Sequence, residues 1–224
     1  MRRQAIGPAP ASPLTDSNRR PLPYHGSALP TELRGRSPTS LAEQPRPPAS
    51  RCVASPPVPA PHAYRTRLVE RRDADALRAI YNVEVLESTV TFDLVPRSLA
   101  DQLAWIDEHS GGHPAIVAVD DGEVGGFASL SPYRPRPAYA TTVEDSVYVR
   151  RDLRGQGVGR LLLGDLVQLA RHHGFHSVVG RIVGDHAASI ALHTACGFQP
   201  VGREREVGRK FNRWLDVVLM QKML

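Results

Sequence analysis

The stretch VYVRRDLRGQGVGRLLLGDL, residues 147–166, combines an alternating apolar segment, three glycines and a leucine-rich segment. Alternation is typical of a strand, and the leucine spacing is typical of an amphipathic helix. Glycines between them allow successive backbone N–H groups to point at one anion, and the helix N-terminus adds partial positive charge. The stretch therefore predicts a phosphate-binding turn between a strand and a helix.

Two common phosphate motifs do not fit this turn. A Walker loop needs Gly-Lys-Ser/Thr before its helix, and the first lysine of the chain is Lys210. A Rossmann fingerprint needs a third glycine in G-x-G-x-x-G, but that place holds Arg160 or Leu162, depending on the starting glycine. The remaining pattern, Arg154-x-x-Gly157-x-Gly159, indicates a pyrophosphate site without a P-loop lysine. A turn that only caps the helix would not require glycine at three alternate positions.

Composition divides the chain near residue 62. Residues 1–62 hold 14 of the 20 prolines, eight arginines and three acidic residues, whereas residues 63–224 hold 20 basic and 20 acidic residues. A proline-interrupted segment with so little apolar surface cannot offset its ordering entropy, so 1–62 is expected to be a disordered Pro/Arg-rich tail. A start codon placed too far upstream is the alternative explanation. Residues 63–224 should form one neutral domain.

Several classes of protein are disfavoured. No run of 18 apolar residues and no signal-peptide core occur in the sequence, so we expect no membrane partner and a cytoplasmic location. Two cysteines, Cys52 and Cys196, provide neither a disulfide framework nor a metal cluster, and no metal is expected. The excess positive charge is diffuse, lies in the tail and lacks interleaved aromatic residues, which argues against nucleic acid.

The periodicity of residues 64–223 predicts an α/β (α+β) fold. Asp73 and Ser98 are the expected helix N-caps, and Asp121-Gly122 is the expected hairpin turn. The expected strands are 64–72, 115–120, 123–133, 142–149, 176–183, 200–207 and 214–223, and the expected helices are 74–88, 99–109, 158–173 and 189–196. This order indicates a mixed, twisted central sheet of about six to seven strands with helices on both faces.

With these motifs in place, the sequence resembles the GNAT superfamily of N-acetyltransferases. The turn matches the superfamily's R/Q-x-x-G-x-G/A acetyl-CoA signature, and AASIALHTACGF (187–198) matches its A-x-x-L-Y-x-x-x-G-F helix. STVTF, RPAY, TVEDSVYV and VGRKFNRWLDVVLMQ are similar to the phosphinothricin/methionine sulfoximine N-acetyltransferase subgroup. The resemblance spans about residues 65–223 and implies a GNAT fold.

The resemblance implies a set of catalytic residues. Glu144 matches the subgroup's catalytic glutamate, the base that deprotonates the acceptor ammonium, and its apolar neighbours should raise its pKa. His193 stands where most of the superfamily has the tyrosine that protonates the departing thiolate. A solvated glutamate and a packing histidine are the alternatives. Asp145 should face the other side of the strand and is expected to be an ordinary carboxylate.

The resemblance also implies contacts with acetyl-CoA, the expected co-substrate. A backbone N–H near Tyr148-Val149 should meet the oxyanion, and His186 replaces the asparagine that usually contacts CoA. The full set of expected donor contacts is Val147, Tyr148, Val149, Arg154, Gly155, Gln156, Gly157, Val158, Gly159, Arg160 and His186. For the acceptor, the matching positions are Phe92, Arg136, Tyr139 and Trp214, with Arg136 as the expected carboxylate or phosphinate clamp.

The expected activity is transfer of acetyl from acetyl-CoA to the α-amine of a small amino-acid-like molecule. Phosphinothricin and methionine sulfoximine or sulfone are the leading acceptors, by direct attack in a ternary complex, and a homodimer is expected. An acetyltransferase of another amine (a peptide N-terminus, an aminoglycoside or a polyamine) is one alternative. A non-enzymatic acyl-CoA sensor is another, although it would not need both Glu144 and His193.

Overall fold

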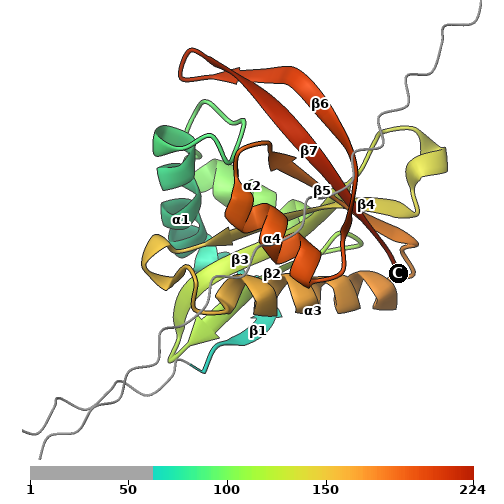
Figure 1. The fold of residues 1–224 in the computed structure, drawn as a ribbon. Helices are drawn as coiled ribbons and strands as arrows, with labels where there is room; N and C mark the ends of the chain where they lie inside the picture. Colours follow the sequence, from blue (N-terminus) through green and yellow to red (C-terminus); the bar gives the residue numbers. More distant parts are fainter. Residues whose placement is uncertain (1–62) are drawn as a thin grey trace, which may run out of the picture. The chain divides into compact units, whose positions relative to one another are not determined.

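The computed structural model describes residues 63–224, and the expectations for residues 1–62 lie outside the described residues. A seven-stranded sheet has the order β1-β2-β3-β4-β5-β7-β6 (Figure 1). Its strands are β1 (Arg65–Leu68), β2 (Ala115–Asp120), β3 (Glu123–Pro132), β4 (Thr142–Val149), β5 (Ser177–Val183), β6 (Gln199–Lys210) and β7 (Arg213–Met223). All neighbours are antiparallel except β4 and β5.

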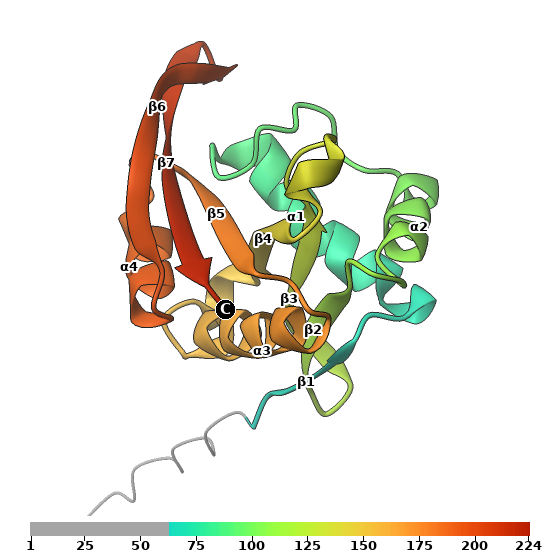
Figure 2. The same ribbon diagram turned by 90° about the vertical axis from the view of Figure 1, so that its right-hand side faces the viewer.

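Helices cover both faces of this sheet, as Figure 2 shows, so the predicted architecture is confirmed. The helices are α1 (Ala74–Glu87), α2 (Leu99–Glu108), α3 (Val158–His172) and α4 (Ala187–Ala195). One apolar cluster joins α3 to the sheet around Leu162, Leu163 and Leu166, each fully buried. A second joins α1 and α2 to β2 and β3 around Leu77 and Phe127. The sheet is therefore the middle of three layers.

The first helix follows its predicted periodicity but not its predicted cap. The side chains that recur at helical spacing along it, Leu77, Ile80, Tyr81, Glu84 and Val85, are all buried. Asp73 makes no cap hydrogen bond to α1. Its carboxylate instead accepts two 2.7 Å bonds from the Arg67 guanidinium and one from the Glu70 N–H. Asp73 therefore stands at the predicted N-cap position, but its side chain does not cap α1 because an arginine on β1 takes the carboxylate.

Other local predictions hold with small shifts at the ends. Ser98 caps α2, accepting from the Asp101 N–H, and Asp121 and Gly122 both have positive φ in the β2–β3 turn. The expected strand 64–72 ends at Leu68, because residues 71–73 form a 3-10 turn. Helix α4 begins two residues earlier than expected.

The last hairpin is longer than predicted and reaches across to the segment after α1. The β6 strand extends to Lys210, whose ammonium is buried and donates to the Thr91 carbonyl oxygen at 2.8 Å. Gly208 lies against the ring of Phe92, so closely that a Cβ there would collide with it. These contacts fix the outer part of the hairpin over residues 91–92, a long-range pairing that local periodicity cannot show.

The feature that positions the site is a separation between β4 and β5. The two strands pair in parallel from Thr142–Ser177 to Asp145–Gly180 and no further. Beyond that point β4 continues beside β3 to Val149, and β5 continues beside β7 to Val183. One edge of β4 is therefore left open within the sheet, next to the glycine turn.

Candidate functional site

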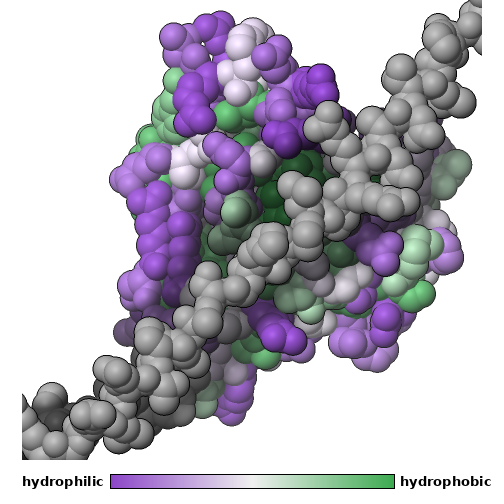
Figure 3. All heavy atoms as spheres, in the orientation of Figure 1, coloured by the Kyte–Doolittle hydropathy of each residue, from purple (hydrophilic) through white to green (hydrophobic). Residues whose placement is uncertain are grey.

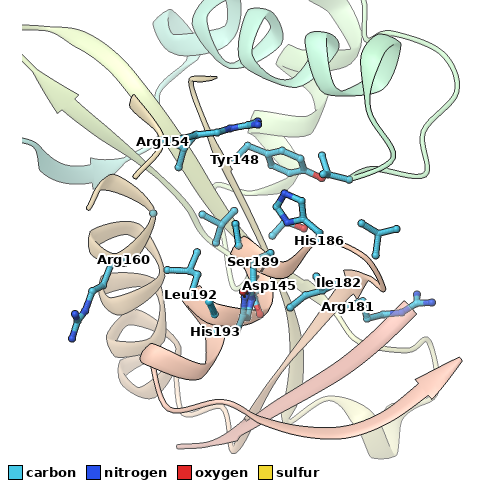
Figure 4. Close-up of a pocket in the computed structure, with 18 of the residues that line it drawn as sticks. Asp145, Tyr148, Arg154, Arg160, Arg181, Ile182, His186, Ser189, Leu192 and His193 are labelled. Carbon is cyan, nitrogen blue, oxygen red and sulfur yellow. Dashed lines mark hydrogen bonds and ion pairs between the residues drawn. The ribbon is translucent and has the colours of Figure 1, made fainter. Parts of the chain in front are cut away.

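A cavity of about 740 Å³ occupies the separation between β4 and β5 (Figure 4). It is bounded by both strands, the glycine turn, α4 and residues 90–92. Of the residues predicted from the sequence, it is lined by Phe92, Glu144, Val147, Tyr148, Val149, Arg154, Gly155, Gly157, Gly159, Arg160, His186 and His193. The space-filling view shows apolar side chains gathered in a hollow on this side of the molecule, bordered by hydrophilic ones (Figure 3).

The open edge of β4 supplies backbone donors to this cavity. The Arg150 N–H bonds to the Gly125 carbonyl oxygen at 2.9 Å, so it points toward β3. Successive residues of a strand direct their N–H groups to opposite sides. The N–H groups of Val147 and Val149 therefore point into the gap, where β5 has moved away. An acyl or amide carbonyl in the cavity can be bound there without breaking the sheet.

The glycine turn has the backbone shape that its sequence predicts. Gly155 and Gly157 have φ of 77° and 91°, a region that side-chain-bearing residues rarely occupy, and Gly157 is the N-cap of α3. A Cβ at either position would meet no heavy atom within 4 Å, so protein packing does not exclude a side chain there. The conformation itself requires glycine. It leaves the first N–H groups of α3 without a side-chain cap, as an anion site needs.

Two residues of this turn do not line the cavity. Val158 is buried as the first residue of α3, and Gln156 donates its Nε2 to the Asp152 carbonyl oxygen at 2.8 Å. Both side chains therefore hold the turn in place. Any contact of theirs with a phosphate has to come from their backbone.

The arginines around the turn differ in direction. Arg160 points away from the other labelled side chains in Figure 4, whereas Arg154 extends toward α1. There its Nη2 lies 2.8 Å from Oε1 of Glu84, and Nε of Arg151 lies 2.8 Å from the same oxygen. Ser88 donates its hydroxyl to Oε2 of Glu84 at 2.7 Å. The turn is thus fastened to the end of α1 through a buried carboxylate.

Glu84 is 2% exposed, and its charge is stabilised by these partners. Burial alone would raise the pKa of Glu84, but the bonds from Arg151 and Ser88 and the charge of Arg154 outweigh it and lower the pKa. The sequence signal was an acidic residue at a buried position of the helical pattern.

Glu144 lies half-buried on β4 and lines the cavity. Burial raises the pKa of its carboxyl, and the positive charge of Arg181 partly opposes the rise. A carboxyl with a raised pKa is a better proton acceptor than an ordinary glutamate. The position and environment fit the expected base.

His193 and Asp145 form a buried pair on the opposite face of the sheet. Nε2 of His193 lies 3.0 Å from Oδ2 of Asp145, and Nδ1 lies 2.8 Å from the Ser189 carbonyl oxygen. Burial would lower the pKa of His193, but the Asp145 carboxylate and the Ser189 carbonyl reverse this and raise it. The expectation that Asp145 is an ordinary solvated carboxylate was wrong, because it is 6% exposed and bound to the imidazole.

His186 lies at the N-terminal end of α4, with its ring in the cavity. Burial and the nearby charge of Arg154 lower the pKa of His186. A neutral imidazole can donate one hydrogen bond and accept another, as the amide of asparagine does. His186 therefore stays a candidate contact for the donor.

Three of the four expected acceptor residues lie outside the cavity lining. Phe92 contributes to the lining, but Arg136, Tyr139 and Trp214 do not. Trp214 is 61% exposed, beside the Arg209 guanidinium, and Tyr139 packs edge-on against Tyr133.

The cavity contains an arginine that the sequence analysis missed. Arg181 lines it from β5 and is exposed within a strand whose other residues are buried. A charged residue inside an apolar strand pattern was the available signal.

Neither a cluster of metal-ligating side chains nor a membrane-spanning helix is found within residues 63–224. Within this range no group of three or more His, Cys, Asp or Glu side chains is placed to hold a metal ion. None of the helices described is long and apolar enough to span a bilayer.

The sequence of this chain is similar to those of known acetyltransferases. Residues 66–219 match the family model of the acetyltransferase (GNAT) domain. The L-methionine sulfoximine/L-methionine sulfone acetyltransferase of Pseudomonas aeruginosa is 44% identical over 151 residues, covering 66% of this chain and 88% of that protein. The phosphinothricin N-acetyltransferase of Alcaligenes faecalis is 41% identical over 165 residues, covering 72% and 83% respectively.

A solved structure extends the comparison to the donor. The phosphinothricin acetyltransferase of Sinorhizobium meliloti, in complex with acetyl-CoA, superposes with a TM-score of 0.69 at 37% identity. The match covers 72% of this chain and 88% of that one. The family model, the sequence identities and the superposed fold all indicate the same family. The chain belongs to the GNAT acetyltransferase family.

Proposed function

We propose that this chain transfers acetyl from acetyl-CoA to the α-amine of a small amino-acid-like acceptor. Phosphinothricin and methionine sulfoximine or sulfone are the leading acceptors, since relatives at 41% and 44% identity are named for them. One observation carries the proposal: a single cavity contains the open edge of β4, the glycine turn and the half-buried Glu144. The proposed sites for acetyl-CoA, for the oxyanion and for the catalytic base therefore share one cavity.

Backbone N–H groups would bind the donor, acetyl-CoA. The N–H groups that begin α3 would hold the pyrophosphate, with Gly155 and Gly157 allowing its close approach. The N–H groups of Val147 and Val149 would hold the amide-rich arm and the reacting carbonyl. An oxyanion bound by a preorganised backbone N–H is stabilised without rearrangement of the site.

The acceptor enters as an ammonium and must lose a proton before it can attack. Glu144 takes that proton, directly or through a water, and the free amine then attacks the thioester carbon in a ternary complex. The C–S bond breaks as the oxyanion collapses, the attacking nitrogen releases its second proton to solvent, and the thiolate takes up one proton. The proposed mechanism uses no metal and no covalent enzyme intermediate.

His193 is the proposed source of the proton for the thiolate, with one condition set by its geometry. Both ring nitrogens lie within hydrogen-bonding distance of oxygens, those of Asp145 and Ser189. The imidazole would have to release Asp145 to donate Nε2–H elsewhere.

The proposed assembly is a homodimer. Tyr139, Trp214 and Phe211 expose large aromatic surfaces, which suits packing in a homodimer. Arg136 would then reach an acceptor only if a loop movement or a second subunit brings it to a cavity. The mass of the protein in solution, measured by light scattering, tests the dimer. A cytoplasmic location completes the proposal.

A panel of acceptors with a free-CoA readout tests the proposed function. We expect CoA release with phosphinothricin and methionine sulfone at a kcat/KM at least about tenfold above that for a peptide amine, since a specific pocket contact is worth about 1–3 kcal/mol. A preference for the peptide, an aminoglycoside or a polyamine would replace the proposed acceptor class. Binding of acetyl-CoA without CoA release from any amine would indicate a sensor.

A further inference from the structure

Arg181 lies at the point where β5 leaves β4. The last two pairs between these strands are Glu144–Val179 and Asp145–Gly180. Side chains two residues apart on a strand point to the same face, so Arg181 shares the face of Val179. Glu144, which pairs with Val179, points to that face as well. Glu144 and Arg181 therefore line the cavity from the same face of the sheet.

The opposite face confirms this alternation independently. A Cβ added to Gly180 would lie 2.8 Å from Cδ2 of His193 and 3.2 Å from Oδ1 of Asp145. Gly180 and Asp145 thus face α4, which carries His193. The two charged residues on either side of this row, Glu144 and Arg181, face away from α4.

The present partner of Arg181 is a glutamate on the outer hairpin. Nη2 of Arg181 lies 3.0 Å from Oε2 of Glu204, and the two side chains are 38% and 32% exposed. Glu204 pairs with Val217 of β7, and Val217 pairs with Val183 of β5. Glu204 therefore lies on the same face of the sheet as Val183 and Arg181, which are two residues apart on β5. A half-exposed ion pair of this kind contributes little net stability and can exchange its partner at low cost.

The charges of the cavity suit a zwitterion. Three arginines are among the described residues that line it, but Arg154 is held by Glu84 and Arg160 points away (Figure 4). Arg181 remains on the face of Glu144. After burial, which raises the pKa of Glu144, the charge of Arg181 has the next largest effect and lowers it. A carboxylate base and a guanidinium on one face match the ammonium and carboxylate of an α-amino acid.

We propose that Arg181 binds the carboxylate of the acceptor, and that Glu204 holds the guanidinium until the acceptor displaces it. The inference rests on the proposed function and narrows its acceptor class to molecules with a free α-carboxylate. A guanidinium presents paired N–H donors that fit the two oxygens of a carboxylate. Arg181, and not only Arg136, then sets specificity for amino acids over simple amines.

Acceptor binding by the full chain, measured calorimetrically for methionine sulfone and for its decarboxylated amine, tests the inference. We expect the wild type to prefer the amino acid, and Arg181→Gln to weaken its binding about 10- to 100-fold while changing amine binding less than about twofold. Glu204→Gln should strengthen amino-acid binding, because the competing carboxylate is removed. Arg203→Gln is the matched control, since Arg203 forms a half-exposed ion pair with Asp216 on the same hairpin.

The outcomes separate the inference from the proposed function. Equal binding of the two ligands by the wild type, or equal losses of both in Arg181→Gln, would overturn the role of Arg181. A loss in Arg203→Gln as large as in Arg181→Gln would overturn it too, by showing a general effect of positive charge. Carboxylate-selective binding without CoA release would instead refute the acetyltransferase proposal and leave the assignment of Arg181 standing.

Discussion

Glu144 and Asp145 are adjacent in the sequence and have different surroundings. Both residues line the cavity, but alternation along β4 places them on opposite faces of the sheet, and Asp145 meets His193 of α4. Both carboxyls leave bulk water, but only Asp145 gains a hydrogen-bonded partner at 3.0 Å. Two neighbouring carboxyls therefore have different surroundings: burial raises the pKa of Glu144 on one face, and Asp145 is paired with an imidazole on the other.

The His193–Asp145 pair predicts a pH-dependent stability. The pKa of His193 is raised above its ordinary value of 6.5, so the stability from the pair is full below that pH and lost as the pH rises through the native pKa. We expect the free energy of unfolding, measured with urea from pH 5.5 to 9, to fall across this range in the wild type. Asp145→Asn should remove most of the fall and cost about 3–5 kcal/mol at low pH.

A second histidine, at the N-terminal end of the same helix, provides the control for this assignment. His186→Gln, which removes an imidazole with a lowered pKa, should keep the fall seen in the wild type. Parallel curves for the wild type and Asp145→Asn would contradict the buried ion pair.

At the level of elements, the glycine turn and α3 act together. Buried leucines fix α3 against the sheet, and the turn presents the first N–H groups of α3 to the cavity. Gly157 has φ of 91° and begins the helix, so the conformation at this one residue determines where the helix dipole points.

Gly157→Ala should therefore weaken acetyl-CoA binding. An alanine in the left-handed region costs about 1–2 kcal/mol, so we expect either a similar loss of stability or a turn that relaxes and loses donor affinity about tenfold. Gly164→Ala is the matched control: Gly164 is inside α3 with open space around it, and the change should add about 0.5–1 kcal/mol. Thermal unfolding and calorimetric titration with acetyl-CoA measure both effects. Unchanged stability and affinity in Gly157→Ala would refute this role.

At the level of the whole molecule, the C-terminal end of α1 joins the glycine turn to the β6–β7 hairpin. The Glu84 carboxylate binds Arg154 of the glycine turn and Arg151 just before it, and the Glu84 carbonyl oxygen is 3.4 Å from the Lys210 ammonium of the β6–β7 hairpin. Lys210 also bonds to Thr91, next to Phe92 in the cavity lining. One helix end thus contacts two segments that are distant from it in the sequence, residues 151–154 and the β6–β7 hairpin.

Glu84→Gln should disturb stability and donor binding together. Loss of a buried, hydrogen-bonded charge costs about 1–3 kcal/mol, and the turn loses the anchor of Arg154. Glu87→Gln removes an exposed ion pair with Arg151 on the same helix and should cost less than about 1 kcal/mol. Denaturant unfolding measures the stability of both variants, and titration with acetyl-CoA measures their affinity for it. Equal effects of the two substitutions would show that burial of Glu84 has no special role.

Much of this molecule could be predicted from local patterns. Alternation located β4 to the residue, and the failed lysine and third-glycine tests left one kind of phosphate turn at Arg154 to Gly159. What local patterns could not show were partnerships between distant segments: Asp145 with His193, and Lys210 with Thr91. Each depends on which chain segments the fold brings together, and sequence periodicity carries no such information.

The pH profile of kcat/KM for the wild type and Glu144→Gln tests the central claim most directly. The free-CoA assay with methionine sulfone from pH 6 to 9 gives both profiles, and Glu87→Gln is the control. In the wild type, kcat/KM should fall as the pH drops toward the raised pKa of Glu144, because a protonated carboxyl cannot accept the ammonium proton. Glu144→Gln should lower kcat/KM about 10²- to 10⁴-fold without loss of thermal stability. Near-wild-type kcat/KM in Glu144→Gln across this range would show that Glu144 is not the base.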